Sequence, residues 1–564
     1  MNRWTRSSAA SLLAGATMLG GAAQAQSPAI QSPLILDRNR PDRIQPVTPT
    51  APQTKAAPSA APAEVEGGAE RTDTIIRGIQ FIGTKAPASA ARAAEPFIGQ
   101  LATRQNLINI ATAVSNGYAK SDVALFSVLI PDQDLSSGMV KVLLIEGQVE
   151  QVIVTDKSGP RARKLITEIA SHLKGEAVLS KTRLQRYISL IQDVPGTKTD
   201  IQIVQGSRRG LVRIVLTITD KKHDFSSSFD NRASATYKGG QITANAKLYG
   251  LLRGGDQTDV TAAASINFKN FKYASIAHST PIGSDGGRAS ASFGYLKTKP
   301  RNSAISGEAQ IAGLTYSYPL IRSYTRNLTL SGTVDGLNSD NAAFGQLISS
   351  ERTRALRFAA GYVDAKPKRT ITGGITVSKG VDMLGARAID VLAEKNFTKV
   401  NARATIDQMI GKRVIARLRL SGQYTKDRLA AAERFAVGGD EFGRAFEIAL
   451  LSGDRGGAGL AELAFRPIKS GKFAGTEIYG FGDYSRITIV ERGPLPQLFS
   501  DGIVRNVIFP SATYDLASAG AGARIAYSTQ AALFLEAARA IDRPYPGYDK
   551  QWRFNVGWRL SLRP

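Results

Sequence analysis

Residues 552–562, WRFNVGWRLSL, alternate strictly between two kinds of side chain. Successive side chains of a β-strand point to opposite faces, so this pattern predicts one strand with an apolar and a polar side. The apolar side comprises Trp552, Phe554, Val556, Trp558, Leu560 and Leu562. The polar side comprises Arg553, Asn555, Gly557, Arg559 and Ser561. A lipid-facing side with tryptophans and a cationic side facing water are typical of a strand in a transmembrane barrel.

Similar segments recur throughout residues 223–564, where helical periodicity is almost absent. ITANAKLYG at 242–250, NLTLSGTVDG at 327–336 and RVIARLRLSGQY at 413–424 are examples, separated by clusters of Gly, Asn, Asp and Pro. Each has about the ~9–11 residues that a tilted membrane strand needs. A soluble β-sandwich would alternate too, but the length of the region and an export signal favour a transmembrane antiparallel β-barrel. Strand boundaries between residues 382 and 412 are ambiguous.

The export signal lies in residues 1–25. Arg3 and Arg6 precede a short apolar stretch, and Ala23 and Ala25 supply the small residues that a signal peptidase requires. Residues 26–72 are rich in Pro, Ala, Ser and Thr, which predicts an extended periplasmic linker or a plug segment. The start of the chain therefore indicates secretion across the inner membrane.

Residues 73–148 and 149–222 read as two copies of one small α+β pattern. Each copy has a strand, two helices and two further strands. The apolar residues indicate this order, because their spacing switches between a period of two residues, typical of strands, and one of 3.6 residues, typical of helices. In the first copy the helical face includes Leu107, Ile110 and Val114; in the second it includes Leu165 and Ile169. Two similar domains therefore precede the predicted barrel.

Composition excludes several functional classes. The chain has no cysteine and three histidines, so disulfide scaffolds, thiolate metal sites and cysteine nucleophiles are ruled out. The 72 Lys and Arg against 47 Asp and Glu give a net charge of +25, but the basic residues are dispersed along strands. That distribution predicts a cationic lumen and attraction to anionic outer-membrane lipid rather than nucleic-acid binding. We expect no enzyme activity, cofactor or metal.

Two segments carry a resemblance to a known family. GYAKSDVALFSVLIPDQDLSSGMVKVLLIEG at 117–147 and DVPGTKTDIQIVQGSRRGLVRIVLTI at 193–218 resemble the paired POTRA domains of two-partner secretion transporters of the haemolysin secretion/activation type. The resemblance implies periplasmic domains that capture an unfolded passenger. It also implies a barrel of 16 strands, for which residues 223–564 are long enough. An open sheet edge suits this role, because an extended chain can add to it through main-chain hydrogen bonds.

A third segment, ERFAVGGDEFGRAFEIALLSGDRGGAGLAELAF at 433–465, resembles the long inward-folded loop of this superfamily. The matching positions are the glycine pair Gly438 and Gly439, the tip residues Arg444 and Phe446, the turn residue Asp454 and the strand residue Glu462. Gly443 replaces the family's valine, and Ala445 replaces its glycine. The arginine and the aromatic residue stay in register despite these differences.

A second family motif, Phe-x-Asp-x-Gly on an inward-facing strand, is matched at Phe481 and Asp483, with Ser485 in place of the last glycine. The resemblance implies that Asp483 holds Arg444. A guanidinium inside a barrel needs an anionic partner, and a bidentate carboxylate would fix its position and orientation. We therefore predict a lock between Arg444 and Asp483 that keeps the loop in the lumen.

The resemblance implies an outer-membrane translocator. Its predicted partner is a large secreted exoprotein, adhesin-like or cytolysin-like, with an amino-terminal secretion domain. Periplasmic chaperones and the barrel-assembly machinery would deliver the transporter itself to the outer membrane of a Gram-negative bacterium. The predicted insertion signal in the last strand comprises Trp558, Leu560 and Leu562.

Two other classes of protein stay open. An assembly factor of the same superfamily would insert other barrels, but it would carry several POTRA domains rather than two. A gated uptake receptor would need a folded plug domain and an energy-coupling segment, which the proline-rich stretch does not provide.

Overall fold

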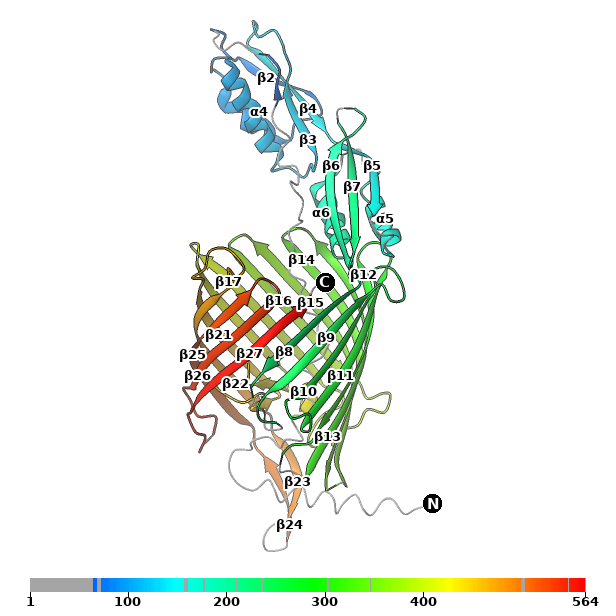
Figure 1. The fold of residues 1–564 in the computed structure, drawn as a ribbon, viewed down its shortest axis with the longest axis vertical. Coiled ribbons are helices and arrows are strands. Elements are labelled where there is room, and N and C mark those ends of the chain that lie inside the picture. The colour runs from blue at the N-terminus through cyan, green and yellow to red at the C-terminus, as the bar shows by residue number, and fades with distance from the viewer. Residues whose placement is uncertain are drawn as a thin grey trace.

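The protein is described from a computed structural model, in which two small α+β domains stand on one end of a barrel (Figure 1). The structure describes residues 64–67 and 73–562, apart from 157–160, 176–177, 209, 233, 235–236, 302–303, 345, 499–502 and 546. The predicted signal at 1–25 lies outside the described residues, as does most of the predicted linker at 26–72. The described part of that linker includes a short strand, β1 (Glu64–Val65), which the sequence did not predict.

The first domain has the predicted order of strand, two helices and two strands. Its elements are β2 (Gly78–Gly83), α3 (Ala88–Ala94), the short 3-10 helix η1 (Glu95–Phe97), α4 (Arg104–Tyr118), β3 (Phe126–Ile130) and β4 (Met139–Glu146). The sheet order is β1-β3-β4-β2. Leu107, Ile110 and Val114 form the buried face of α4, as their helical spacing predicts.

The second domain repeats this architecture without a counterpart of β1 among the described residues. Its elements are β5 (Gln148–Asp156), α5 (Arg163–Ser171), α6 (Lys181–Gln192), β6 (Thr197–Gln205) and β7 (Leu211–Asp220), with sheet order β5-β7-β6. Helix α6 begins where the Ser180 side chain accepts a hydrogen bond from the Arg183 amide. Leu165, Ile166 and Ile169 of α5 pack into the core.

The barrel is closed by 16 antiparallel strands, the number that the resemblance implied. Its first half comprises β8 (His223–Asp230), β9 (Gln241–Tyr249), β10 (Gln257–Ser265), β11 (Phe271–Ile282), β12 (Gly287–Thr298), β13 (Ile305–Arg322), β14 (Arg326–Ala343) and β15 (Gln346–Lys366). Its second half comprises β16 (Arg369–Gly380), β17 (Thr398–Ile410), β18 (Val414–Tyr424), β21 (Arg455–Phe465), β22 (Glu477–Ile489), β25 (Ala512–Tyr527), β26 (Ala531–Ala540) and β27 (Trp552–Leu562).

The last strand closes the barrel against the first. β27 pairs with β8 from Gly557, opposite Asp230, to Leu562, opposite Phe225. The side chains of β27 alternate as predicted. Asn555 is buried on the lumen side, and Phe554 is exposed on the outside. The ambiguous stretch, residues 382–412, contains a loop up to residue 397 and then strand β17.

Two segments that are not part of the barrel wall start at the end of the barrel opposite the α+β domains. A hairpin of β23 (Arg492–Leu498) and β24 (Val504–Phe509) projects from the end opposite the α+β domains (Figure 1). Between β18 and β21 the chain forms a 3-10 helix η2 (Ala431–Glu433) and the strands β19 (Phe435–Val437) and β20 (Leu451–Gly453), which pair with each other. In the part of the chain that the structure describes, no helix is both long and apolar enough to cross a membrane.

The second α+β domain is bound directly to the barrel. Asp193, which caps α6, forms a bidentate ion pair with Arg322 at the end of β13, with N–O distances of 2.5 and 2.7 Å. Arg186 of α6 donates to Asp285 in the β11–β12 turn at 3.0 Å. Strand turns on this side of the barrel therefore form a docking platform for the domain.

Candidate functional site in the barrel lumen

The segment from residue 425 to 454 folds back into the barrel from the end that lies away from the α+β domains; we call it the inner loop. Its β19–β20 stalk carries a tip formed by residues 438–450. Gly438 and Gly439 begin the tip with φ angles of +108° and +115°, which side-chain-bearing residues rarely adopt. A Cβ atom on Gly438 would lie 2.2 Å from the Glu447 carbonyl oxygen. The glycine pair is thus required by the turn into the tip.

Arg444 lies at the tip and is 3% exposed. Its Nη1 atom is 3.2 Å from Oε2 of Glu462 on β21 and 3.1 Å from Oε2 of Glu536 on β26. Its guanidinium also covers the Phe481 ring, 4.6 Å from the ring centroid. The arginine therefore joins the loop tip to two strands of the wall through buried, charge-assisted contacts.

Asp483 contacts the same tip through the backbone. Its Oδ1 accepts the Gly443 amide at 2.9 Å, and its Oδ2 accepts the Arg444 amide at 3.3 Å. Ser518 of β25 donates a third hydrogen bond, of 2.6 Å, to Asp483. The structure thus brings Arg444 and Asp483 together, but the predicted bridge between their side chains is not the contact that forms. Asp483 lies beside the backbone turn, whereas the long guanidinium extends past it to the glutamates.

Glu462 and Glu536 are buried and each has several partners. Glu462 accepts from Arg524 at 2.6 Å and from Arg417 at 2.9 Å. Glu536 was not singled out in the sequence, although its position on the lumen side of β26 follows from strand alternation. It accepts hydrogen bonds from Arg232 (2.8 Å), Tyr479 (2.9 Å) and Asn555 (3.1 Å) as well as from Arg444. The loop arginine therefore joins an existing lumenal network of charges.

The aromatic residues of the two motifs surround this network. Phe446 is 1% exposed, and its ring lies 5.4 Å from that of Tyr548, in the segment before β27. Phe481 faces the lumen from β22, next to Tyr479 on the same face. Burial of Phe446 against the wall, and of Phe481 on the inner side of the wall, strengthens the tip's polar contacts because it excludes water from them.

Asp454 has a larger role in the structure than a turn residue. Its carboxylate forms a bidentate ion pair with Arg492, at 2.8 and 3.0 Å, directly beyond the end of β22. It also accepts the amides of Leu429 and Val490, both at 2.8 Å. Asp454 therefore joins the two legs of the inner loop to the segment that leads into the β23–β24 hairpin.

The three residues of the predicted insertion signal lie on the outer face of β27. Leu560 is 43% and Leu562 69% exposed, and the Trp558 ring lies 6.5 Å from Phe229 of β8. Their outward direction agrees with contact to lipid. Their recognition by an insertion machinery stays a prediction.

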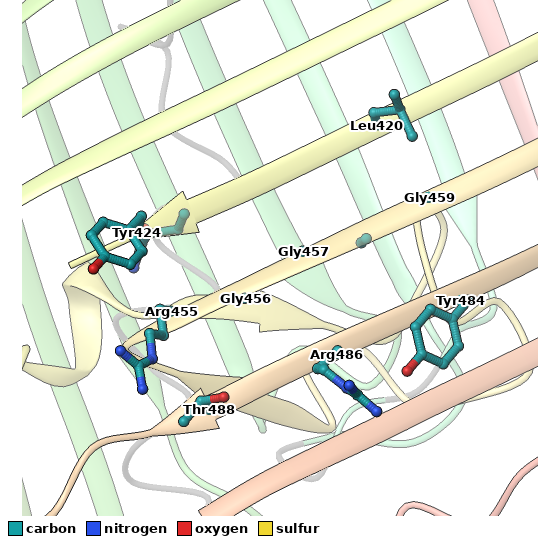
Figure 2. Close-up of a pocket in the computed structure, with 11 residues that line it drawn as sticks. Leu420, Tyr424, Arg455, Gly456, Gly457, Gly459, Tyr484, Arg486 and Thr488 are labelled. Carbon is teal, nitrogen blue, oxygen red and sulfur yellow. The ribbon is translucent and has the colours of Figure 1, made fainter. Parts of the chain in front are cut away.

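A furrow of about 500 Å³ runs over the outer face of β18, β21 and β22 (Figure 2). Figure 2 shows Gly457 and Gly459 along its floor, with Leu420 and Tyr484 beside it. These positions alternate with the lumen-facing residues of the same strands, so the furrow faces lipid and is separate from the loop site. Within the described residues, no group of three or more His, Asp or Glu side chains is arranged to hold a metal ion.

A closed 16-strand barrel that carries two POTRA-like domains and a loop folded into its lumen defines an outer-membrane transporter, with the POTRA domains in the periplasm. Comparison with known proteins gives the family. The profile of the haemolysin secretion/activation protein ShlB/FhaC/HecB matches residues 211–499, and that of the ShlB-type POTRA domain matches residues 74–147. The chain belongs to this family of two-partner secretion transporters.

Individual relatives agree with this assignment. The heme/hemopexin transporter protein HuxB of Haemophilus influenzae is 23% identical over 476 residues, which cover 80% of each chain. The outer membrane transporter CdiB of Dickeya dadantii is 23% identical over 62% of this chain and 64% of its own. The structure of CdiB from Escherichia coli aligns with 96% of this chain and all of its own, with a TM-score of 0.65 and 18% identity. The family match supports the transporter and not the assembly factor.

Proposed function

We propose that this transporter secretes one dedicated exoprotein, which it captures unfolded in the periplasm and passes through the barrel once the inner loop has left the lumen. The observation that carries the proposal is the way in which the tip is held. Polar contacts from Arg444 and Asp483 fix the tip next to an apolar cluster that includes Phe446. Water or a passing chain can replace such polar contacts.

Capture of the partner rests on the edges of the two periplasmic sheets. In the first domain the edge strand β3 pairs in parallel with β1, so that Val65 lies opposite Ile130. The equivalent edge strand of the second domain, β6, pairs only with β7 among the described residues. An extended segment of the partner would add to such an edge through main-chain hydrogen bonds, which tolerate many sequences.

The names of the relatives indicate a transport role. HuxB is described as a heme/hemopexin transporter, and CdiB as an outer membrane transporter. For this chain we propose a large adhesin-like or cytolysin-like exoprotein with an amino-terminal secretion domain. Folding of the partner outside the cell would bias movement outward, since the periplasm offers no ATP.

The test compares the extracellular and outer-membrane proteomes of cells with and without this protein. We expect the loss of one or a few large secreted proteins, while unrelated barrels keep their levels. Return of the transporter on a plasmid should restore secretion. A general fall in other barrels would overturn the proposal and favour an assembly factor.

A further inference from the structure

The inner loop is held at two levels that share no side chain. The first level, the tip lock, consists of Arg444, Asp483, Glu462 and Glu536, described above. The second level lies nearer the end of the barrel that is away from the POTRA domains; we call it the base lock. It consists of Glu433 with Arg357 and Lys399, and of Asp454 with Arg492.

Glu433 of η2 is 3% exposed and binds two cations of the wall. Arg357 on β15 donates to both of its carboxylate oxygens, at 2.6 and 3.0 Å. Lys399 on β17 lies 2.8 Å from Oε2. Asp335 on β14 binds Arg357 from the other side at 2.5 and 3.0 Å, so that the guanidinium lies between two carboxylates. One loop residue is thereby fixed to a wall segment that extends from β14 to β17.

A single wall residue joins the two halves of the base lock. Nε2 of Gln423, at the end of β18, donates to the carbonyl oxygens of Glu433 at 3.0 Å and Asp454 at 2.8 Å. Oε1 of Gln423 accepts a hydrogen bond of 2.7 Å from Asn401. The two legs of the loop therefore meet at one buried, hydrogen-bonded group, and neither leg can leave without breaking it.

The tip lies deeper in the barrel than the base lock, and it is joined to the base by a different kind of backbone. Its wall partner Glu462 lies seven residues along β21 from Arg455, where the loop ends, toward the POTRA end of the barrel. The joint between stalk and tip is the pair Gly438 and Gly439. Hinges consist of a few loop residues, often small ones, and glycine tolerates the widest range of backbone angles. A chain that enters from the periplasm therefore meets the tip before it meets the base.

From this arrangement we infer that the two locks are separable, and that the base lock stays closed during transport. Glu433 and Asp454 are then positioning residues, which hold the stalk against the wall while the tip swings about the glycine pair. The transport part of this inference rests on the proposed function. The independence of the two locks does not rest on the proposed function, because it can be measured without a partner protein.

The absence of cysteine makes single-cysteine reporters specific. Ala431→Cys in the base and Ala445→Cys at the tip each add only a sulfur atom to a buried alanine, 7% and 1% exposed. The purified transporter in lipid vesicles is treated with a membrane-impermeant maleimide, and heat-modifiable migration on gels confirms a folded barrel. At rest we expect both reporters to be protected.

Each lock is then broken in turn. Arg444→Ala should raise the labelling rate of the Ala445→Cys reporter about tenfold or more and leave the Ala431→Cys reporter protected. Glu433→Gln and Asp454→Asn should expose the Ala431→Cys reporter. Glu441→Gln is the matched control, because Glu441 lies on the same loop in an exposed pair with Arg403 and should change neither reporter.

The final arm uses cells in which the secreted partner is arrested in transit. We expect labelling at position 445 with continued protection at 431. Equal labelling of both reporters would show that the loop leaves as one body and would overturn the fixed base. If the Glu433→Gln variant secretes normally and its Ala431→Cys reporter stays fully protected, the base lock does not hold the stalk against the wall. If no partner exists, the proposed function fails while the vesicle result still decides whether the locks are independent.

Discussion

Arg444 is the residue that we expect to contribute most to holding the tip in the lumen, because it pairs with Glu462 and Glu536. In Arg444→Ala, Glu462 and Glu536 lose a shared buried cation, a change that costs about 3–5 kcal/mol when no other partner remains. Arg417, Arg524 and Arg232 still neutralise the two glutamates, so we expect a smaller loss and a folded barrel. The tip should leave its site, which would raise single-channel conductance in planar bilayers and strongly reduce secretion.

Arg403→Ala is the control for that prediction, because its side chain is half exposed and pairs with Glu441 at 3.2 Å. Exposed ion pairs contribute about 0–1 kcal/mol, so conductance and secretion should stay near those of the parent. Normal secretion and conductance in Arg444→Ala would contradict the lock.

The loss of secretion should depend on which residue replaces Asp483, because Asp483 holds the tip by accepting hydrogen bonds. Asp483→Ala leaves the amides of Gly443 and Arg444 without their acceptor, and each unsatisfied buried donor costs about 1–3 kcal/mol. Asp483→Asn keeps one acceptor oxygen and should retain more secretion than the alanine variant. Secretion assays on both variants at matched barrel levels check the order, and an equal loss in both would indicate that the charge matters instead.

Motif reasoning located the tip residues and two of their wall partners, but not the third partner, Glu536. Arg444, Asp483 and Glu462 could be named because they stand at motif positions in the sequence. Glu536 stands in no motif, and its contact with Arg444 depends on the register between β25 and β26 and on the reach of a guanidinium. Glu433 was missed for the same reason, since Arg357 and Lys399 are distant in sequence and meet it only once the barrel closes.

At the level of the element, β27 should tolerate charge on one face only. Leu560→Arg places a cation on the lipid-facing side, at a cost of about 0–1 kcal/mol near an interface and 2–4 at the midplane. Ser561→Arg, one residue further, points into the lumen and is the matched control. We expect less heat-modifiable barrel in purified outer membranes for Leu560→Arg alone. Equal levels of the two variants would contradict the assigned faces.

Long periodic elements were predictable, whereas short ones were not. The helices α4, α5 and α6 and the face of β27 follow from repeated spacing, which burial in a core or in lipid enforces. By contrast, β1 spans only Glu64–Val65 and forms because the β3 edge offers partners for its backbone. The three-residue strands β19 and β20 exist because each pairs with the other inside the lumen. Backbone pairing of this kind leaves little mark in sequence.

The whole molecule depends on how the second POTRA domain sits on the barrel. The contacts join barrel turns to Asp193 at the end of α6 and to Arg186 within it. No periodic pattern marks these positions, so the sequence predicted both domains but not their docking. Burial of Asp285 in the β11–β12 turn opposes its charged form, but hydrogen bonds from Arg186 and Tyr318 outweigh this and lower its pKa. A carboxyl with a lowered pKa stabilises the docked state above its ordinary pKa and loses that effect as the pH falls through the lowered value.

Docking should therefore be constant near neutral pH and weaken only below about pH 4, where aspartates protonate. Spin labels on single cysteines in α6 and in the barrel would report the distance distribution between pH 7 and pH 3. Asp285→Asn should broaden that distribution already at pH 7, because the neutral amide cannot replace the ion pair with Arg186. Asp134→Asn is the control: Ser136 hydrogen bonds lower the pKa of this exposed carboxyl too, but it lies in the first domain. A narrow, pH-independent distribution in Asp285→Asn would show that the Asp285 carboxylate is not needed for docking. The Asp193–Arg322 ion pair and the hydrogen bond from Arg186 to the Pro319 carbonyl oxygen would then be sufficient.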